Sequence, residues 1–183
     1  MNVNASPVTS QPYIPLVPAL FLTSTYQEYV VFGLRPSRFS GSEKVFQCPI
    51  CKSDLRLEQK SLICSNRHCF DIAKSGYVNL AIGTKTSKYY SKETFQNRRE
   101  ILEKGYYSHI LKALAQLIED YGRIDTILDI GCGEGYYSRK IKEALSDKDI
   151  IAFDISKDSI QLASKSDFNN SIKWFVGDRK STR

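Results

Sequence analysis

The stretch that decides the fold is ILDIGCGEGYYS, residues 127–138, in which an acid precedes three glycines at alternate positions. An apolar strand pattern comes before it and a helix pattern after it, so the glycines lie at a strand-to-helix turn, where the backbone can approach a ligand closely. A dinucleotide-binding loop would need its last glycine at position 136, which is Tyr136. The spacing is instead that of an S-adenosylmethionine (SAM) loop. The candidate cofactor-binding residues are Asp129, Gly131, Gly133 and Gly135.

The segments that follow alternate between strand and helix patterns. They are expected at 125–130 (strand), 136–146 (helix), 149–156 (strand), 157–166 (helix) and 172–178 (strand). This βαβαβ order predicts a parallel sheet with helical crossovers. Asp154, near the end of the second strand, is placed to accept hydrogen bonds from ribose hydroxyls. A glycine loop alone could be an ordinary turn, but this context favours a cofactor loop.

A second group of chemically active residues is a cysteine cluster. Cys48 and Cys51 form one CxxC-like corner, and Cys64 with His68 forms another. An alternating strand pattern between the corners predicts a hairpin that brings them together, which favours a tetrahedral zinc site over a thioredoxin-type redox motif. Four protein ligands leave no open position, so the zinc would be structural. Spacing alone allows either His68 or the neighbouring Cys69 to be the fourth ligand.

Composition limits the class of protein. The chain has 183 residues, a net charge of +6 and 42% hydrophobic residues, as a globular chain does. The basic balance modestly favours an acidic partner such as nucleic acid. The apolar residues 13–34 are interrupted by Pro, Thr, Gln and Glu, and no basic signal-peptide start precedes them. We therefore expect a cytoplasmic protein without a membrane segment.

Four stretches together resemble one family, the large-subunit ribosomal RNA guanine-N1 methyltransferases of the RlmA/RrmA type. They are FQCPIC, ICSNRHCFDIAKSGYVNL, RREILEKGYYSHI and LDIGCGEGYYS, and the resemblance covers roughly residues 45–178. It implies that zinc is bound by Cys48, Cys51, Cys64 and His68, which favours His68 over Cys69. It also implies that Tyr107, Gly133 and Glu134 touch SAM.

The resemblance also implies an activity and partners. The family methylates N1 of a guanine in a hairpin loop of 23S rRNA, works as a homodimer and uses its zinc module in RNA recognition. Nothing in the sequence is a convincing base for removing the N1 proton, so no catalytic residue is named. Arg98 and Arg99 could contact RNA phosphates, or they could belong to a solvated charged face.

The expected fold class is α/β, with an N-terminal zinc-ribbon-like module followed by the first half (βαβαβ) of a Rossmann-like class I SAM-dependent methyltransferase fold. The expected parts are a poorly ordered, proline-rich extension (1–42), a zinc-binding module (43–83), a basic helical linker (84–122) with helices at 92–104 and 108–121, and a partial SAM-binding methyltransferase domain (123–183). If the true start lies downstream, the extension has no function.

Family members continue beyond the third strand, and a half-sheet would leave one side of the fold exposed. We therefore expect weak or absent activity from this chain alone. The alternative hypothesis is a non-catalytic, zinc-dependent RNA-binding protein, which would bind RNA in a salt-dependent way and would not need SAM.

Overall fold

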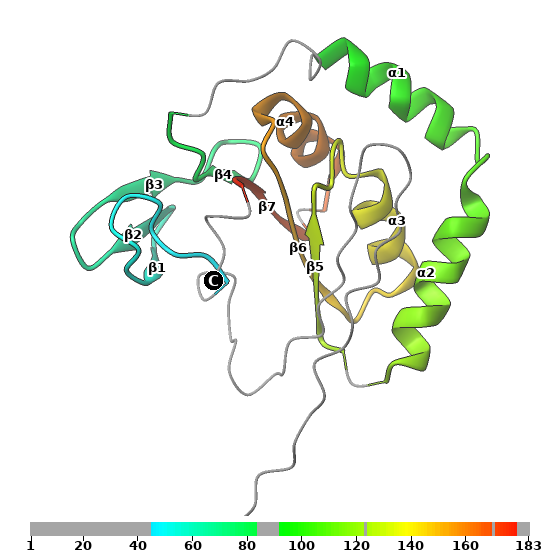
Figure 1. Ribbon diagram of the computed structural model, residues 1–183, viewed down its shortest axis with the longest axis horizontal. Coiled ribbons are helices and arrows are strands. Elements are labelled where there is room, and N and C mark those ends of the chain that lie inside the picture. Colours follow the sequence, from blue (N-terminus) through cyan, green and yellow to red (C-terminus); the bar gives the residue numbers. More distant parts are fainter. Residues whose placement is uncertain (1–44, 84–91, 123, 170, 179–183) are drawn as a thin grey trace, which may run out of the picture.

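The computed structural model describes residues 45–83, 92–122, 124–169 and 171–178 (Figure 1). The strands and helices expected between residues 92 and 178 are all present, with bounds within two residues of the expected ones. The expected extension 1–42 lies outside the described residues. The elements are β1 (Leu55–Glu58), β2 (Ser61–Cys64), β3 (Cys69–Asp71), β4 (Tyr77–Asn79), α1 (Lys92–Glu103), α2 (Ser108–Asp120), β5 (Thr126–Ile130), α3 (Tyr136–Ala144), β6 (Asp149–Asp154), α4 (Lys157–Ser166) and β7 (Ile172–Val176).

A parallel sheet forms the centre of the fold, with the strand order β4-β7-β6-β5. The βαβαβ order expected from the sequence accounts for β5, β6 and β7 and their helical crossovers. The stretch GYVNLAIG (76–83) was expected to be extended, but its place in this sheet as β4 was not expected, because a short strand pattern does not indicate its pairing partner. It pairs with β7 through Tyr77 opposite Trp174 and Val78 opposite Phe175, and so covers the outer edge of β7.

The cysteine-rich segment forms a separate antiparallel sheet, β1-β2-β3. The expected hairpin is present, with Leu57 of β1 opposite Leu62 of β2. β3 then pairs with β2 and leads through a tight turn into β4. An isolated antiparallel bridge joins Ile72 to Val78, so the two sheets are connected by backbone pairing as well as by the chain.

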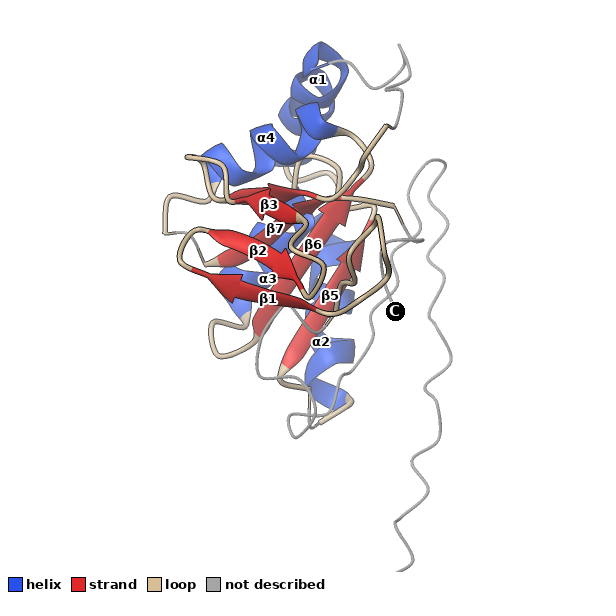
Figure 2. Cartoon of the chain, turned by 90° about the vertical axis from the view of Figure 1, so that its left-hand side faces the viewer, coloured by secondary structure: helices blue, strands red, loops and turns tan. Residues whose placement is uncertain are grey.

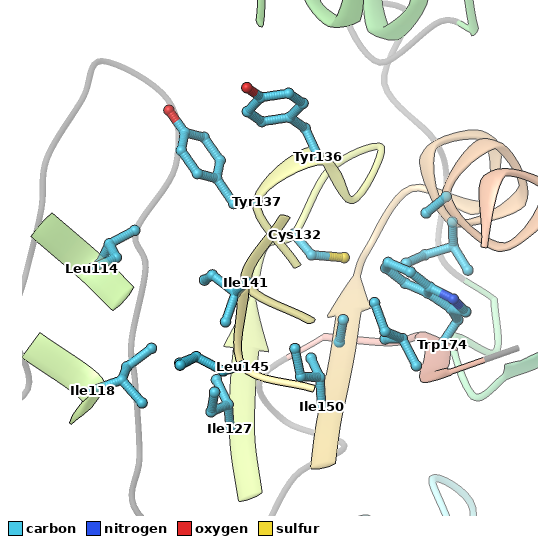
Figure 3. Close-up of a cluster of buried hydrophobic side chains, with 14 of the residues drawn as sticks. Leu114, Ile118, Ile127, Cys132, Tyr136, Tyr137, Ile141, Leu145, Ile150 and Trp174 are labelled. Carbon is cyan, nitrogen blue, oxygen red and sulfur yellow. The ribbon is translucent and has the colours of Figure 1, made fainter. Parts of the chain in front are cut away.

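One face of the parallel sheet is covered by helices. Ile127 of β5 and Trp174 of β7 belong to a buried cluster that also contains Ile141 of α3 and Ala163 of α4. Leu114 of α2 joins the same cluster (Figure 3). Neighbouring residues of a strand point to opposite faces, so this face takes alternate apolar residues from each strand.

The opposite face of the parallel sheet packs against the cysteine-rich sheet. Phe46 is fully buried there, with its ring centroid 4.2 Å from that of Phe175 and 5.7 Å from that of Phe153. Leu62 and Phe70 from β2 and β3 belong to the same cluster. Figure 2 shows β1–β3 in front of the parallel sheet and α3 behind it. The strands β5–β7 are therefore buried on both faces, as parallel strands usually are.

Helix α1 lies on the side of the parallel sheet where the carboxyl ends of β5 and β6 meet (Figures 1 and 2). Gly105 ends the helical segment with a φ of 79°, and α2 begins three residues later and runs beside α3. The placement of α1 matters, because ligands of open α/β sheets bind at the carboxyl ends of the strands. None of the helices in the described ranges has the length and apolarity needed to cross a membrane.

Candidate functional site

Two tight turns position the cysteine ligands. In the first, the Lys52 N–H donates a hydrogen bond to the Cys48 carbonyl (2.8 Å), and the Cys48 N–H donates to the Ser53 carbonyl (2.9 Å). In the second, the Arg67 N–H donates to the Cys64 carbonyl (2.9 Å). Lys52 and Arg67 have φ values of 61° and 63°, in the left-handed region that closes such turns. Each turn thereby aims its ligands at the other.

The four ligand atoms gather within 4.8 Å of one another. Cys51 Sγ lies 3.6 Å from Cys64 Sγ, and His68 Nδ1 lies 3.5 Å from Cys48 Sγ and 3.3 Å from Cys64 Sγ. A tetrahedral zinc with ordinary Zn–S and Zn–N bond lengths would separate its ligands by about 3.5–3.8 Å. The donor set and its spacing therefore fit one structural zinc ion.

Local hydrogen bonds change the pKa of the cysteine thiols in this cluster. The side chain and backbone of Ser53 donate to Cys51, and they lower the pKa of its thiol to about 5. Burial, in contrast, raises the pKa of Cys48. Zinc binds cysteine as the thiolate, so Cys51 already offers the required form at neutral pH.

Cys69 lies outside the cluster. The alternation of β3 leaves Cys69 and Asp71 exposed and buries Phe70 between them, and Cys69 Sγ lies 3.7 Å from Asp71 Oδ1. The sequence left His68 and Cys69 open on spacing alone. The structure brings His68 to the three sulfurs and turns Cys69 away, and the assignment of His68 as the fourth ligand stays a prediction.

Separate substitutions of His68 and Cys69 should show which of the two binds zinc. We expect His68→Ala to reduce bound zinc well below one per chain, because it removes a ligand that faces the cluster. Cys69→Ser should retain one zinc per chain, since its side chain points to solvent. Zinc content of the purified variants, measured by elemental analysis, checks this. Equal zinc in the two variants would contradict the assignment of His68.

The glycine-rich loop is fastened to the end of β6. The N–H groups of Gly131 and Cys132 donate to the Phe153 carbonyl (2.8 and 3.2 Å), and the Gly133 N–H donates to Asp154 Oδ2 (3.0 Å). Gly131, Gly133 and Gly135 all have positive φ, a conformation that glycine adopts readily and other residues rarely do. The alternating glycines are therefore required by the path of the loop itself.

Two buried carboxylates lie behind this loop. Ser138 Oγ donates to Asp129 Oδ2 (2.5 Å), whereas Asp129 Oδ1 is buried and lacks a hydrogen-bond partner among the described residues. Burial raises the pKa of Asp129 to about 6. Asp154 accepts from the Ser156 N–H (2.8 Å) as well as from the loop, and burial raises its pKa too. An unpartnered buried acceptor fits a bound ligand that supplies a donor.

Glu134 and Tyr107, the other two expected cofactor contacts, occupy different settings. Glu134 is buried, and its carbonyl and its carboxylate oxygen Oε2 accept from Arg139 (2.7 and 3.3 Å). Tyr107 precedes α2, and the residue is 39% exposed. Arg139 was missed by the sequence analysis. Its only sequence signal is its position one turn into the helix that follows the loop.

The two expected RNA-contacting arginines are both partly buried. Arg99 Nη1 donates to Ser166 Oγ (2.6 Å), which joins α1 to the end of α4. Arg98 is partly buried. A phosphate contact through either residue stays a prediction.

Family models match both parts of the chain. A model described as RlmA, N-terminal, matches residues 46–88, and a model described as a methyltransferase domain matches residues 123–175. The chain carries an RlmA-type zinc ribbon and a methyltransferase domain. The family resemblance and the α/β fold class expected from the sequence are thereby confirmed, and the methyltransferase domain implies SAM as its cofactor.

Curated relatives agree with both matches. A putative 23S rRNA (guanine-N(1)-)-methyltransferase of Bacillus subtilis (strain 168) is 37% identical over 148 residues, which cover 73% of this chain and 50% of the relative. The 23S rRNA (guanine(748)-N(1))-methyltransferase of Streptomyces fradiae is 29% identical over 125 residues, covering 67% of this chain and 45% of the relative. The chain thus spans about half the length of the curated relatives it matches.

Proposed function

We propose that this chain provides the zinc ribbon and the cofactor-binding part of an enzyme that transfers a methyl group from SAM to N1 of a guanine in a 23S rRNA hairpin loop. The observation that carries the proposal is the combination of a SAM-type glycine loop, backed by two buried carboxylates, with an RlmA-type zinc ribbon. The names of the relatives support the RNA substrate. A cytoplasmic location follows from that substrate, and the homodimer stays a prediction.

The residues of the loop have distinct roles in this proposal. Asp154 has acceptor capacity beyond its two backbone hydrogen bonds, which suits ribose hydroxyls. No described residue donates to Asp129 Oδ1, which leaves an acceptor beside the loop. The absence of a Cβ at Gly131 and Gly133 would let a ligand approach the backbone, whereas Gly135 makes room for Trp174. Bound SAM would supply an electrophilic methyl group. These residues would hold the cofactor and orient it for transfer of that group.

The target guanine must also be accessible to the methyl group. Base pairing hides N1 of guanine, so the enzyme must act on a loop base or on one that has been flipped out. In this proposal the ribbon, held in shape by zinc, presents the RNA beside the cofactor loop. Removal of the N1 proton is assigned to no residue of the chain.

Asp154→Ala should weaken SAM binding about tenfold to a hundredfold, because it removes a charged acceptor for two hydroxyl groups. Isothermal titration calorimetry with SAM measures the change. Asp149→Ala is the matched control, since Asp149 is an exposed acid at the opposite end of the same strand. Circular dichroism of both variants checks that they fold. Equal SAM affinity in the two variants would remove Asp154 from the site.

The reaction itself is tested with tritiated SAM and an unmodified 23S rRNA fragment. Incorporation that stops when the target guanine carries a 1-methyl group supports the proposal. Salt-dependent binding of the same RNA, together with no detectable heat from SAM, would instead support the non-catalytic RNA-binding protein.

A further inference from the structure

A nearly buried arginine joins the cofactor loop to the helix that follows it. The side chain of Arg139 in α3 is 10% exposed, and that of Glu134 in the loop is 2% exposed. Arg139 Nη1 donates to the Glu134 carbonyl (2.7 Å), and Nη2 lies 3.3 Å from Glu134 Oε2. One guanidinium therefore holds both the backbone and the side chain of a loop residue, through two nitrogens of a rigid planar fork that a lysine lacks.

The same guanidinium reaches helix α1. Arg139 Nη2 lies 3.8 Å from Glu103 Oε1 at the end of α1, and Glu103 Oε1 in turn lies 3.7 Å from Arg99 Nε, one turn earlier. Arg99 Nη1 donates to Ser166 Oγ of α4. We call these five residues, Arg99, Glu103, Glu134, Arg139 and Ser166, the Arg139 latch. It connects α1, α3, α4 and the glycine loop.

Helix α1 is held by little apolar surface, so the polar contacts of the latch matter for its docking. Its buried side chains are Phe95 and Leu102, and Leu102 belongs to the cluster on the helical face of the sheet. Helices α3 and α4, in contrast, each bury four residues, among them Ile141 of α3 and Ile160 of α4. A helix with few buried apolar contacts detaches at a low cost in free energy. The small contribution of a few ion pairs and hydrogen bonds then decides how often the helix is docked.

Docked α1 brings positive charge to the cofactor side of the sheet. Burial raises the pKa of both Asp154 and Tyr137, and the partly buried Arg98 opposes both shifts. Arg98 precedes the latch residue Arg99 directly. The position of α1 thus determines whether this charge is present where β6 ends.

We propose that Arg139 is a positioning residue that fastens α1 to the glycine loop, so that docking of α1 and occupation of the loop by a ligand favour one another. The ligand in this inference is SAM, which rests on the proposed function. The dependence of α1 on the latch does not rest on it. Coupling between two sites is reciprocal, so SAM protects α1 by the same factor by which docked α1 strengthens SAM binding.

The test uses Glu103→Gln, which removes the α1 side of the latch at a half-exposed position and leaves Glu134 and Arg139 paired. Glu100→Gln is the control, because Glu100 is an exposed acid of the same helix that belongs to none of these ion pairs. Hydrogen–deuterium exchange of α1 is followed by mass spectrometry with and without SAM, and SAM affinity is measured by calorimetry. Arg139→Lys, which keeps the charge but loses the forked contact, is compared with both.

In the ligand-free protein, α1 should exchange about two- to fivefold faster in Glu103→Gln than in Glu100→Gln, as expected for a partly exposed ion pair. SAM affinity should fall by a similar factor, and Arg139→Lys should weaken SAM binding about tenfold. The latch is overturned if α1 exchanges equally fast in Glu103→Gln and Glu100→Gln. If the unsubstituted chain binds no SAM, the proposed function fails, while the exchange of ligand-free α1 still decides the latch.

Discussion

Replacing Cys64 with serine is expected to cost the chain its zinc and to unfold the ribbon together with the methyltransferase domain, in a single transition at much lower temperature. Cys48 and Cys64 are fully buried and belong to the same apolar cluster as Phe153 and Phe175 of the parallel sheet. Zinc binding contributes about 10–16 kcal/mol to the folding of small zinc modules, so the loss of one ligand exceeds the stability of an ordinary domain.

The control is Cys69→Ser, the same chemical change at an exposed cysteine outside the cluster, which should leave zinc content and melting temperature near those of the unsubstituted chain. Zinc is measured by elemental analysis, and unfolding by circular dichroism and by the fluorescence of Trp174, which reports on the parallel sheet. If Cys64→Ser loses zinc while the tryptophan transition stays in place, the ribbon and the sheet are independent folding units.

Phe46→Leu separates packing from metal binding in the same experiment. The ring of Phe46 lies against those of Phe153 and Phe175, and a leucine keeps the site apolar while losing the aromatic contacts. The substitution should therefore lower the tryptophan transition without changing the zinc content. A variant that loses zinc instead would mean that Phe46 holds the ribbon together and does not connect it to the sheet.

The sequence was most informative where a residue type is required at its position for a single physical reason. Glycines at positions 131, 133 and 135 predict a tight strand-to-helix turn, and the structure gives all three a positive φ. The strands β5 to β7 are mostly apolar because both faces of the sheet are covered, and such apolar runs between helix patterns predict a parallel sheet. The spacing of the cysteines likewise predicts two ligand pairs. It does not distinguish His68 from Cys69, because only the structure of β3 shows that Cys69 points away from the cluster.

What could not be predicted depends on contacts between distant segments. β4 has three residues, and its place beside β7 is decided by pairing with a strand almost a hundred residues later. Phe46 reads as an ordinary apolar residue until the ribbon packs on Phe175. Arg139 is one of many basic residues of the chain, and only burial beside Glu134 distinguishes it. Periodicity carries no information about such long-range contacts.

Gly135→Ala should be the most damaging substitution within the glycine loop. Gly135 has a φ of 76°, and a Cβ there would lie 2.4 Å from Trp174 Cη2 and 2.9 Å from Ala163 Cβ. Trp174 cannot turn away freely, because its Nε1–H donates to Asp167 Oδ2 (3.0 Å). Left-handed strain of about 1 kcal/mol and overpacking of about 1–3 kcal/mol together predict a loss of roughly 2–4 kcal/mol in the free energy of unfolding.

Urea denaturation of Gly135→Ala and Gly122→Ala separates these two causes. Gly122 has a φ of 85° but nothing within 4 Å of the added Cβ, so its substitution carries the backbone strain alone. The difference between the variants is then the cost of pushing α3 away from Trp174. Equal losses would mean that the indole moves without cost. Glycine would then be required at position 135 only for its backbone conformation. Gly135→Ala should in that case bind SAM with unchanged affinity.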